Sequence, residues 1–467
     1  MTAHDREVDG VEDALALVGD APNSPGGSPG SPSDGAPGPA RTQGQLRADV
    51  RSAGAAPRGD GSAVSWADAR ALAEGAGRAA APDPAARARR VALGAALGEA
   101  LAEPLAALTD LPSFDTSAMD GWAVSGPGPW SVRDAGTTPP VLAGHAGAAP
   151  LPDGAAVRIA TGARVPPGTT AVVRSEHART DSTHRLHAER AVVPGQDIRP
   201  RGQECHTGDR LLPAGSLVTP AVLGLAAAAG YDTLLTVPRP RVEVLVLGDE
   251  LLAEGLPHDG LIRDALGPMI GPWLRALGAE VVATRRLGDD ADAVHRAVTG
   301  SGADLVLTTG GTAAGPVDHV HPVLAKAGAE LLVDGVAVRP GHPMLLARLA
   351  SGRHLVGLPG NPLAAVSGLL TLAEPLLRAL AGLAPRAPYY APLRGEAQGH
   401  PYDTRLIPFV HRDDGLVPLR FHGPAMLRGI AAADGLAVVT PGGARAGDVL
   451  EVLDLPWTAS ADGVCFT

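Results

Sequence analysis

Three short apolar runs in the second half of the chain restrict its fold more than any other feature. They cover residues 242–247, 304–308 and 354–358, and Glu243 is the only charged residue inside the first run. Apolar runs of this length are typical of strands that are buried on both faces of a parallel sheet. Segments with a helical pattern lie between the runs, near residues 268–277, 291–298 and 319–327. This alternation of strands and helices predicts a doubly wound α/β domain with a mostly parallel sheet.

The segments on either side of this domain have β-type patterns. Short apolar runs separated by Gly, Pro and polar turns fill residues 120–200 and predict a β-rich domain. Two hairpins, over residues 405–420 and 436–453, predict a small C-terminal β-barrel or sheet.

Helical patterns flank the β-rich domain. Ser65 can cap a helix that runs to about Ala81, and residues 219–230 are also expected to be helical. Residues 87–108 are rich in Ala and Leu and predict a second helical stretch with a break at Pro104. These segments predict a mixed helical linker domain that is split in the sequence.

We therefore expect five parts along the chain. They are a disordered Gly/Pro/Ser-rich tail at residues 1–62, a split N-terminal helical linker domain at 63–119 and 201–240, the β-rich domain at 120–200, the α/β domain at 241–386, and the C-terminal β domain at 387–467. The tail is expected to be disordered because it has too few apolar residues to offset the entropy lost on ordering.

Composition excludes several classes of protein. The chain has 39 basic and 50 acidic residues and 3% aromatic residues, so it is a poor candidate for nucleic-acid binding, which needs a basic surface. No run of about 18 apolar residues is evident, and we expect no membrane partner. Residues 1–12 are acidic and lack the order of a secretion signal. Cys205 and Cys465 are far apart, which favours a reduced, cytoplasmic protein.

Each of the three predicted strands ends in a loop that suits a ligand. The loops read LGDEL at 247–251, TGGTAAGPVD at 309–318 and LPGNP at 358–362. In an open parallel sheet, ligands bind where the carboxyl ends of the strands meet. Glycines let the backbone approach a ligand, and a helix that starts after the loop adds free N–H groups and the positive end of its dipole. The loops therefore predict a site for a phosphorylated ligand.

Carboxylates in the same loops suit a hard metal ion. Asp249, Glu250 and Asp318 offer oxygen ligands, which Mg²⁺ prefers and zinc does not. Each loop also has a simpler interpretation as a tight turn, and Asp318 can cap a helix. The sequence contains no GxxxxGK[ST], GxSxG or HExxH motif, so these three chemistries have no support.

The order of these loops, with the segments before them, resembles the MoeA-type molybdopterin molybdenumtransferases, the family that includes the E domain of gephyrin. The resemblance covers residues 64–467, and its most specific segment is PSFDTSAMDGWAV at 112–124, which is similar to PxFDNSAMDGYAV in the family. The other matching segments are 161–168, 199–208, 248–251, 310–318 and 358–362.

The resemblance implies a fold, a reaction and an assembly. The implied fold is an elongated multidomain subunit with a MogA-like α/β domain, a β-rich domain, a mixed helical linker domain and a small C-terminal β-barrel. The implied reaction inserts molybdate into adenylylated molybdopterin and releases AMP with the help of Mg²⁺, in molybdenum cofactor biosynthesis. The implied assembly is a homodimer.

The resemblance also implies roles for individual residues. It implies that Asp120, Asp249, Glu250 and Asp318 are catalytic, the last three as metal ligands. The binding residues that it implies are Thr161, Glu204, Asp264, Gly310, Gly311, Thr312, Gly315, Arg339, His342, Pro359, Gly360 and Asn361. From the residues alone, Asp120 and Thr161 are interpreted as turn residues that precede Gly121 and Gly162.

The chain departs from the family pattern at several of these positions. Alanine at 313 replaces a serine, His342 replaces a lysine, and Ala265 and Leu266 replace polar neighbours of Asp264. Pro424 takes the place of a serine, and Glu204 that of an aspartate. The leading prediction is an active molybdopterin molybdenumtransferase. The alternatives are a catalytically weakened paralogue that binds a molybdopterin-type ligand as a carrier or regulator, and a scaffold for protein assembly.

Overall fold

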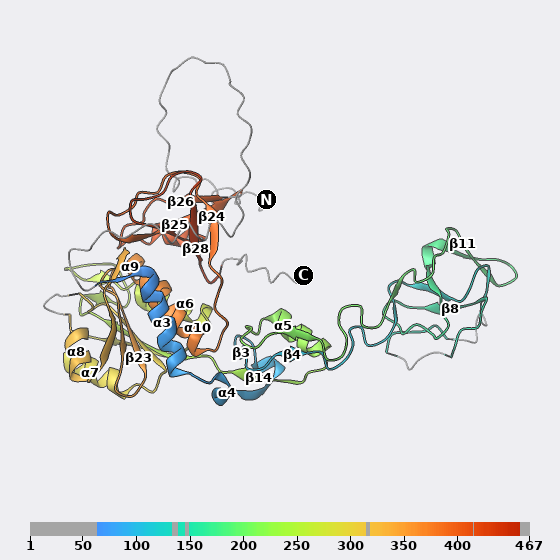
Figure 1. The fold of residues 1–467 in the computed structure, drawn as a ribbon, viewed down its shortest axis with the longest axis horizontal. Coiled ribbons are helices and arrows are strands. Elements are labelled where there is room, and N and C mark those ends of the chain that lie inside the picture. The colour runs from blue at the N-terminus through green and yellow to red at the C-terminus, as the bar shows by residue number, and fades with distance from the viewer. Residues whose placement is uncertain (1–62, 133–138, 145–148, 314–317, 414, 458–467) are drawn as a thin grey trace, which may run out of the picture. The chain divides into compact units, whose positions relative to one another are not determined.

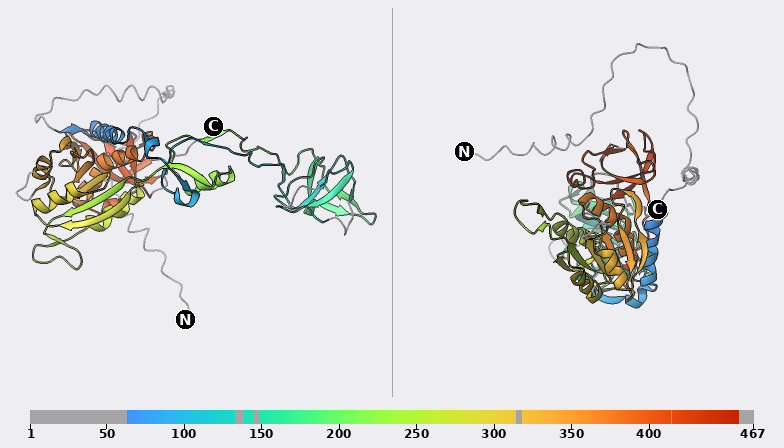
Figure 2. Two further views of the ribbon diagram at one scale, coloured as in Figure 1. Left: turned by 90° about the horizontal axis from the view of Figure 1, so that it is seen from below. Right: turned by 90° about the vertical axis from the view of Figure 1, so that its left-hand side faces the viewer.

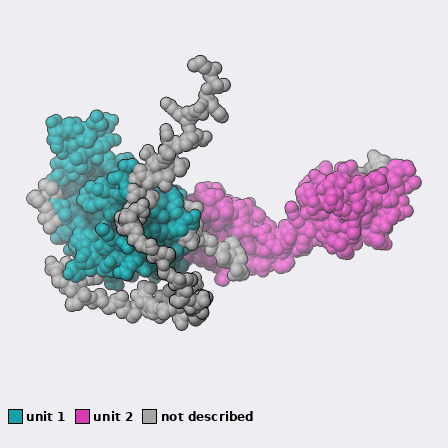
Figure 3. Space-filling view, turned by 90° about the horizontal axis from the view of Figure 1, so that it is seen from above, with its two compact units in different colours: residues 1–82, 239–381, 385–467 teal, residues 83–238, 382–384 magenta. Residues whose placement is uncertain are grey.

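The computed structural model describes residues 63–132, 139–144, 149–313, 318–413 and 415–457. The predicted tail at 1–62 and the site residue Gly315 lie outside the described residues. The chain divides into two compact units (Figure 3). Unit 1 contains residues 1–82, 239–381 and 385–467, and unit 2 contains residues 83–238 and 382–384.

The α/β part of unit 1 is built on a six-stranded sheet (Figure 1). In spatial order its strands are β18 (Glu280–Leu287), β15 (Arg241–Leu247), β19 (Leu305–Thr309), β23 (His354–Leu358), β22 (Leu345–Arg348) and β20 (Glu330–Asp334). The first four strands are parallel, and β22 is antiparallel to both of its neighbours. The three strands predicted from apolar runs are confirmed to within one residue.

The strand order contains a topological switch point. β15 is the first strand of this sheet along the chain, the second strand, β18, lies on one side of it, and the third, β19, lies on the other. The connections after β15 and β19 therefore diverge at the carboxyl edge. This divergence leaves the crevice in which α/β sheets of this kind bind ligands.

Helices cover both faces of the sheet (Figures 1 and 2). One face carries α7 (Ala291–Gly300) and α8 (Val320–Lys326). The other face packs against α6 (Leu266–Ala276), α3 (Trp66–Ala80) and a long helix made of α9 (Pro362–Gly368), the π-turn Leu369–Ala373 and α10 (Glu374–Leu380). The helices predicted between the strands, and the helix capped by Ser65, are confirmed.

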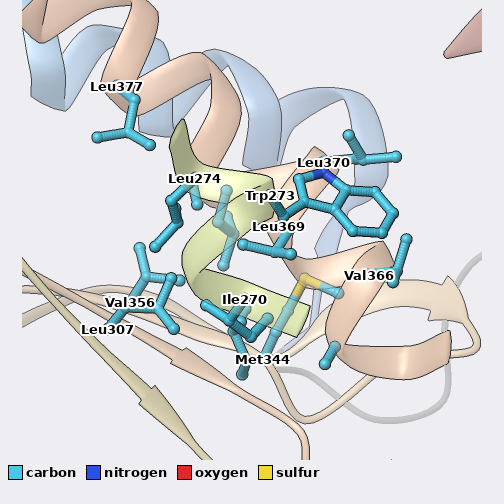
Figure 4. Packing of buried hydrophobic residues seen from close by; sticks show 14 of the residues in the cluster. Ile270, Trp273, Leu274, Leu307, Met344, Val356, Val366, Leu369, Leu370 and Leu377 are labelled. Atoms are coloured by element: carbon cyan, nitrogen blue, oxygen red, sulfur yellow. The ribbon is translucent and has the colours of Figure 1, made fainter. Parts of the chain in front are cut away.

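The core of unit 1 lies between the sheet and these helices (Figure 4). Ile270 and Trp273 of α6 pack with Leu307 of β19, Val356 of β23 and Leu370 of the long helix, and each is at most 3% exposed. Burial of apolar surface on this scale is the main stabilising contribution to a fold that has few aromatic side chains. This core fixes the sheet, and with it the loops at its carboxyl edge.

One charged residue lies inside the sheet. Glu243 of β15 is 7% exposed, and its Oε1 atom lies 2.6 Å from Nε of Arg285 on the neighbouring strand β18. A buried carboxylate without a partner would be strongly destabilising, so the ion pair with the edge strand accounts for this exception to the apolar run.

The long helix from Pro362 to Leu380 corrects the expectation that no segment resembles a membrane span. It is long and apolar enough to cross a membrane by length and composition. In the structure 89% of it is buried, and it packs against α3. A helix that is apolar on all sides is typical of a large protein core as well as of a membrane, and here it forms the centre of unit 1.

A second sheet completes unit 1. Its strands, in order, are β1 (Val64–Ser65), β21 (Val336–Arg339), β25 (Thr404–Arg412), β27 (Gly435–Val439), β28 (Val449–Asp454) and β24 (Tyr389–Pro392), and β26 (Gly415–Pro418) pairs with β25. The two predicted C-terminal hairpins are confirmed as β25–β26 and β27–β28. The parallel pairing of β21 with β25 joins the α/β segment to the C-terminal strands.

Unit 2 contains the predicted β-rich region. Its largest sheet has the order β10 (Ala178–Thr180), β11 (Arg185–Ala188), β7 (Trp130–Val132), β8 (Ala155–Ile159), β6 (Gly121–Val124) and β9 (Ala171–Arg174). Smaller sheets are formed by β2 (Arg89–Ala92), β14 (Thr233–Val237) and β3 (Ala100–Leu101), by β13 (Arg210–Leu212) with β4 (Leu105–Ala106), and by β12 (Ile198–Arg199) with β5 (Thr116–Ser117).

The second predicted helix, at residues 87–108, is wrong. Only α4 (Pro84–Arg87) is helical at its start, and the remainder forms β2, a 3₁₀ turn at Leu93–Ala95, β3 and β4. Strands β2 and β3 pair with β14, which lies more than 130 residues further along the chain, and this pairing overrides the helical preference of Ala and Leu. The helix predicted at 219–230 is confirmed as α5 (Pro220–Ala228).

The other short elements of the described residues lie in connections. They are the 3₁₀ turn Ser175–His177 in unit 2, and β16 (Leu251–Leu252), β17 (Ile262–Arg263) and α11 (Arg428–Ala431) in unit 1.

Candidate functional site

The carboxyl edge of the α/β sheet brings three glycine-containing loops together. The N–H of Gly310 donates to the carbonyl oxygen of Leu358 at 2.8 Å, which joins the second loop to the third. A Cβ atom on Gly310 would lie 3.4 Å from the carbonyl oxygen of Leu247 at the end of β15. A Cβ atom on Gly360 would lie 3.7 Å from the Cα atom of Gly310. The loops after β15, β19 and β23 therefore lie side by side, with Gly310 in the middle.

The backbone of the middle loop requires glycine. Gly310 has φ of +83° and Gly311 has φ of +69°, a region that residues with a Cβ atom rarely adopt. The loop therefore has no side chains at these two positions, and a ligand can approach its backbone closely. This is the arrangement that phosphate-binding loops use.

The carboxylates of the first loop lie at the same edge. Oδ1 of Asp249 approaches the position that a side chain on Gly288, after β18, would occupy. The carboxylate of Glu250 folds back over Gly248. Among the described residues there is no cluster of three or more His, Cys, Asp or Glu side chains arranged to hold a metal ion. Asp249, Glu250 and Asp318 therefore do not form a ready-made three-carboxylate cage.

Asp318 follows residues 314–317, which lie outside the described residues. Two positions after Asp318, the N–H of Val320 donates to the carbonyl oxygen of Gly311 at 3.3 Å. This bond fixes the start of α8 beside the Gly310–Gly311 pair, so Asp318 lies two residues from a direct contact with the loop.

Asp264 has a role in the fold. Its side chain is 1% exposed, its Oδ1 atom accepts a hydrogen bond from the N–H of Gly267 at 2.8 Å, and its Oδ2 atom pairs with Arg286 of β18. The first bond caps the start of α6, and the second neutralises the buried carboxylate. Both oxygens of Asp264 therefore have protein partners in this structure.

Arg339 and His342 also have protein partners. Nε of Arg339 donates to Oδ2 of Asp403 at 2.9 Å. Nδ1 of His342 lies 2.9 Å from the carbonyl oxygen of Val336 and must donate to it, because a carbonyl can only accept. The imidazole therefore holds the turn between β21 and β22.

The start of α9 corrects one expectation. The sequence predicts free N–H groups at the start of the helix that follows the PGNP loop, but the N–H groups of Leu363 and Ala364 both approach the carbonyl oxygen of Pro424, at 2.9 and 3.3 Å. The C-terminal strand region therefore caps the helix that follows the PGNP loop. Anion binding at this edge depends on the Gly310–Gly311 loop and on cationic side chains instead.

Sequence reasoning missed two residues beside this cap, Arg405 and His422. Arg405 is the partner of Arg339 in the β21–β25 register, and its Nη2 atom lies 3.1 Å from Nδ1 of His422. Burial, with a smaller contribution from Arg405, lowers the pKa of His422, so its Nδ1 accepts from the guanidinium as a neutral ring. No local pattern marks these residues, because their neighbours are brought in by strand pairing.

In unit 2 the structure brings Asp120 and Thr161 into direct contact. Oδ1 of Asp120 accepts hydrogen bonds from the backbone N–H of Thr161 at 2.7 Å and from its hydroxyl at 2.9 Å. These hydrogen bonds lower the pKa of Asp120, and the bond from the backbone N–H of Thr161 contributes most to the shift. Pairing of β6 with β8 at Gly121 and Ile159 holds the two segments together. Asp120 is therefore an exposed carboxylate that stays ionised and has a fixed orientation.

Glu204 lies in a different part of unit 2. It is exposed, and its backbone N–H donates to the carbonyl oxygen of Leu111 at 2.8 Å. Residues 110–117 and 198–209 run antiparallel here and are tied by Asp110, which accepts from the N–H and hydroxyl of Thr207 and from Arg201. These hydrogen bonds lower the pKa of Asp110 to about 2, and the bonds from Thr207 contribute most to the shift.

Asp110→Asn is expected to lower the midpoint of thermal unfolding at pH 7 and to weaken its dependence on acid. Because folding depresses the pKa of Asp110, its contribution to stability is complete above about pH 4 and is lost as the pH falls through about 2. Unfolding midpoints measured at pH 7, 4 and 2.5 test this. Asp232→Asn removes the same charge at an exposed position in unit 2 and serves as the control. Equal pH profiles for wild type and Asp110→Asn would contradict the prediction.

Three family models match the chain. The MoeA N-terminal region (domain I and II) matches residues 59–230, the probable molybdopterin binding domain matches residues 243–379, and the MoeA C-terminal region (domain IV) matches residues 390–455. The matched residues include the glycine loops of unit 1 and the Asp120–Thr161 pair of unit 2.

Known proteins match over most of the chain. Molybdopterin molybdenumtransferase 2 of Mycobacterium tuberculosis is 35% identical over 386 residues, which cover 78% of this chain and 93% of the relative. Molybdopterin molybdenumtransferase of Staphylococcus aureus is 30% identical over 386 residues, which cover 79% of this chain and 91% of the relative.

Solved structures match in fold. The molybdopterin biosynthesis moeA protein of Pyrococcus horikoshii has a TM-score of 0.63 at 20% identity and covers 84% of this chain and 100% of its own. A molybdenum cofactor biosynthesis protein of Pyrococcus furiosus has a TM-score of 0.51 at 15% identity, and the match covers 84% of this chain and 99% of that protein's chain. At these identities the likeness concerns the fold alone, and it confirms the predicted multidomain α/β and β architecture.

Proposed function

The chain belongs to the MoeA-type family of molybdopterin molybdenumtransferases, enzymes of molybdenum cofactor biosynthesis, and we propose that it inserts molybdenum from molybdate into adenylylated molybdopterin. In this reaction the dithiolene of the pterin receives the metal and AMP is released. The observation that carries the proposal is the junction of three loops around Gly310 at the topological switch point. A bare backbone at such a junction suits the pyrophosphate of an adenylylated substrate.

The backbone of Gly310 and Gly311 is proposed to hold the phosphate groups. The Gly310 N–H already bonds to the carbonyl oxygen of Leu358, so the N–H of Gly311 is proposed as the donor to the phosphate. Pro359, Gly360 and Asn361 form the adjacent wall of the site, because Gly360 touches Gly310. The amides of Leu363 and Ala364 are capped by Pro424 and have no part in this binding.

Magnesium is proposed to be held jointly by protein and substrate. Mg²⁺ in proteins is commonly bound by one or two carboxylates together with substrate phosphates and water, so a cage of three carboxylates is not required. Asp249 and Glu250 follow β15, whose last residue, Leu247, lies beside Gly310, and they would be the first ligands, with Asp318 as the third candidate. When bound, the ion would polarise the phosphoryl group that is cleaved.

Molybdate is an oxyanion substrate, and cationic side chains of unit 1 would attract it. Arg339 and Arg405 are neighbours on paired strands, and each is oriented by hydrogen bonds, to Asp403 and to the carbonyl of Gln398. His342 contacts Val336, the first residue of β21, which is the strand that carries Arg339. A guanidinium that is held in a fixed orientation binds an oxyanion with less loss of entropy than a free one.

Asp120 and Thr161 of unit 2 are proposed as further catalytic and binding residues. The two hydrogen bonds from Thr161 use one carboxylate oxygen of Asp120 and leave the other available. Asp120 is ionised at neutral pH, and because its pKa is lowered it is a weak base that suits a hydrogen-bond acceptor better than a general base. Glu204, which is exposed, is proposed as a supporting binding residue, and Asp264 is proposed to support the site through the fold, by holding Arg286 and the start of α6.

The proposal extends to assembly and location. The resemblance implies a homodimer, and we propose that this protein is a homodimer in the cytoplasm. The two cysteines, far apart in the sequence, suit a reducing compartment. Sedimentation velocity on the purified protein should give a species of twice the chain mass.

A direct assay tests the reaction. Purified protein supplied with Mg²⁺, molybdate and adenylylated molybdopterin is expected to release AMP, and omission of molybdate should slow the release. The Staphylococcus aureus relative assayed in parallel controls for the substrate preparation. If that relative releases AMP and this protein does not, the proposal is wrong.

The same assay separates the alternatives. A weakened paralogue would bind adenylylated molybdopterin in calorimetry without releasing AMP. A scaffold protein would show neither binding nor release.

A further inference from the structure

A hollow in unit 2 lies apart from the residues described so far. Its volume is about 610 Å³, within the range of pockets that bind small organic molecules. One wall is the loop 126–130 between β6 and β7, and the other is formed by the segment 190–194. Asp120 precedes β6 and the first wall follows it, so the hollow lies at the end of this strand opposite Asp120.

Hydrogen bonds to Thr170 hold both walls in place. The N–H of Gly126 donates to Oγ1 of Thr170 at 3.1 Å, and the N–H of Gly195, next to the second wall, donates to the carbonyl oxygen of Thr170 at 2.8 Å. The indole N–H of Trp130 donates to the carbonyl oxygen of Gly126 at 2.8 Å, and a Cβ atom on Gly128 would lie 2.8 Å from the indole ring. The hollow is therefore formed before any ligand binds, and a ligand would not lose affinity by ordering it.

Most of the surface that lines the hollow is apolar. Pro127 and Pro129 are exposed on the first wall, and Val193 on the second wall is 58% exposed. Ala171 of β9 and Ala188 of β11, which pack in the core of the sheet, also line it. A ligand with an apolar body would remove this surface from water, which contributes about 25 cal/mol per Å².

The two titratable side chains that line the hollow, His187 and Arg190, are both basic. Nε2 of His187 lies 2.7 Å from Oδ2 of Asp181, and this hydrogen bond is the largest of several that lower the pKa of Asp181. Asp181 is therefore ionised, and His187 is the donor. Arg190 is exposed and makes no hydrogen bond or ion pair with any described residue. Of the described residues that line the hollow none is acidic, although acidic residues outnumber basic ones in the chain.

We propose that the hollow binds a small organic acid, with its carboxylate against Arg190 and its apolar body between the two walls. Charge complementarity decides this choice, because an unpaired guanidinium beside apolar surface favours a ligand that offers both features. The inference does not rest on the proposed function, since the whole of β6 separates the hollow from Asp120.

Octanoate is the probe that tests the inference, and octanamide, which has the same apolar chain without the charge, is its neutral match. Binding to the full-length protein is measured by displacement of the fluorescent anion 8-anilinonaphthalene-1-sulfonate, and by the rise of the unfolding midpoint with octanoate concentration. Wild type is expected to bind octanoate saturably and more tightly than octanamide. Only the binding of octanoate should weaken at high salt, because salt screens its charge.

Variants of the walls locate the binding. Arg190→Gln should bind octanoate about fivefold more weakly, the upper end for an exposed ion pair, and should bind octanamide like wild type. Arg179→Gln is the matched control, since Arg179 is exposed on β10 of the same sheet and does not line the hollow, and it should bind both probes like wild type. Val193→Glu places a negative charge in the hollow and should weaken octanoate binding more than Val193→Gln, which has the same size.

Three results would overturn the inference. Equal affinity of wild type and Arg190→Gln for octanoate would show that the guanidinium does not bind the carboxylate. Equal affinity of wild type for octanoate and octanamide would show that the hollow does not select an anion. If wild type shows no saturable binding, and Val193→Glu lowers the sedimenting mass, the hollow is instead a contact between copies of this chain. Release of AMP by wild type tests the proposed function separately from all three.

Discussion

Gly121→Ala is expected to lower the free energy of unfolding of unit 2 by about 3 kcal/mol, the upper end of the usual cost of overpacking. Gly121 begins β6 and is paired on both sides, with Ile159 of β8 and Arg174 of β9. A methyl group at this position would overlap the carbonyl oxygen of Val173 and lie 2.9 Å from its carbonyl carbon. These are backbone atoms of a neighbouring strand, so only separation of β6 from β9 would relieve the clash.

Chemical denaturation followed by tryptophan fluorescence measures this loss, because Trp122 and Trp130 report on the same sheet. Hydrogen exchange should show the loss of protection in β6 and β9 and not in the α/β sheet of unit 1. Gly224→Ala is the matched control, since Gly224 is exposed in α5 of the same unit and has open space around it. That variant should gain up to about 1 kcal/mol from helix propensity. A Gly121→Ala protein as stable as wild type would contradict the prediction.

The position of Gly121 gives this prediction a functional consequence. Asp120 precedes it directly, and the pairing of β6 with β8 holds Asp120 against Thr161. A shift of β6 would therefore displace the carboxylate. The glycine of the sequence segment SAMDG is thus explained by the close approach of β9, which the sequence alone did not indicate.

The strands of the α/β domain could be predicted because their signal is local. A strand that is buried on both faces must be apolar along its whole length, and the runs that end at Leu247, Thr308 and Leu358 satisfy this condition. The helix that starts after Ser65 could be predicted for the same reason. A capping side chain lies within three residues of the amide that it binds, which here is the amide of Asp68.

The errors arose where distant segments determine the local structure. Residues 87–108 have a composition that favours helix, but β14 supplies strand partners that no local pattern contains. The cap on α9 comes from Pro424, about 60 residues along the chain from Leu363. Arg405 and His422 were missed for the same reason, because their neighbours are assembled by sheet pairing.

The candidate site was predicted in part from its residues and in part from the resemblance. Glycines at the ends of consecutive buried strands indicated a shared edge, and Gly310 does lie between the loops after β15 and β23. The contact of Asp120 with Thr161 could be predicted only from the resemblance, because 41 residues separate them.

Asp120→Asn is expected to reduce AMP release by about tenfold to a hundredfold while leaving the fold intact, the range typical of removing one hydrogen bond to a charged group. Asparagine has the same shape, and its carbonyl oxygen can still accept from the N–H and hydroxyl of Thr161, so the turn should persist. What is lost is the negative charge, which the lowered pKa of Asp120 maintains at neutral pH. The rate of AMP release at saturating adenylylated molybdopterin measures the effect.

Two comparisons decide whether the charge or the turn matters. Asp181, in the turn between β10 and β11, accepts from the N–H and hydroxyl of Thr183 at 2.8 and 2.7 Å, and its other oxygen lies 2.7 Å from Nε2 of His187. Asp181→Asn controls for charge removal at a similar turn and should release AMP at the wild-type rate. Thr161→Val keeps the charge of Asp120 but removes one of its two hydrogen bonds, and a loss of about tenfold is expected from the weaker orientation. Full activity of Asp120→Asn, together with a large loss in Thr161→Val, would show that Asp120 serves only to hold the turn. The two hydrogen bonds that Thr161 donates to the carboxylate of Asp120 are also available to the amide, so a loss of activity in Asp120→Asn with an unchanged unfolding midpoint would assign the loss to the missing charge.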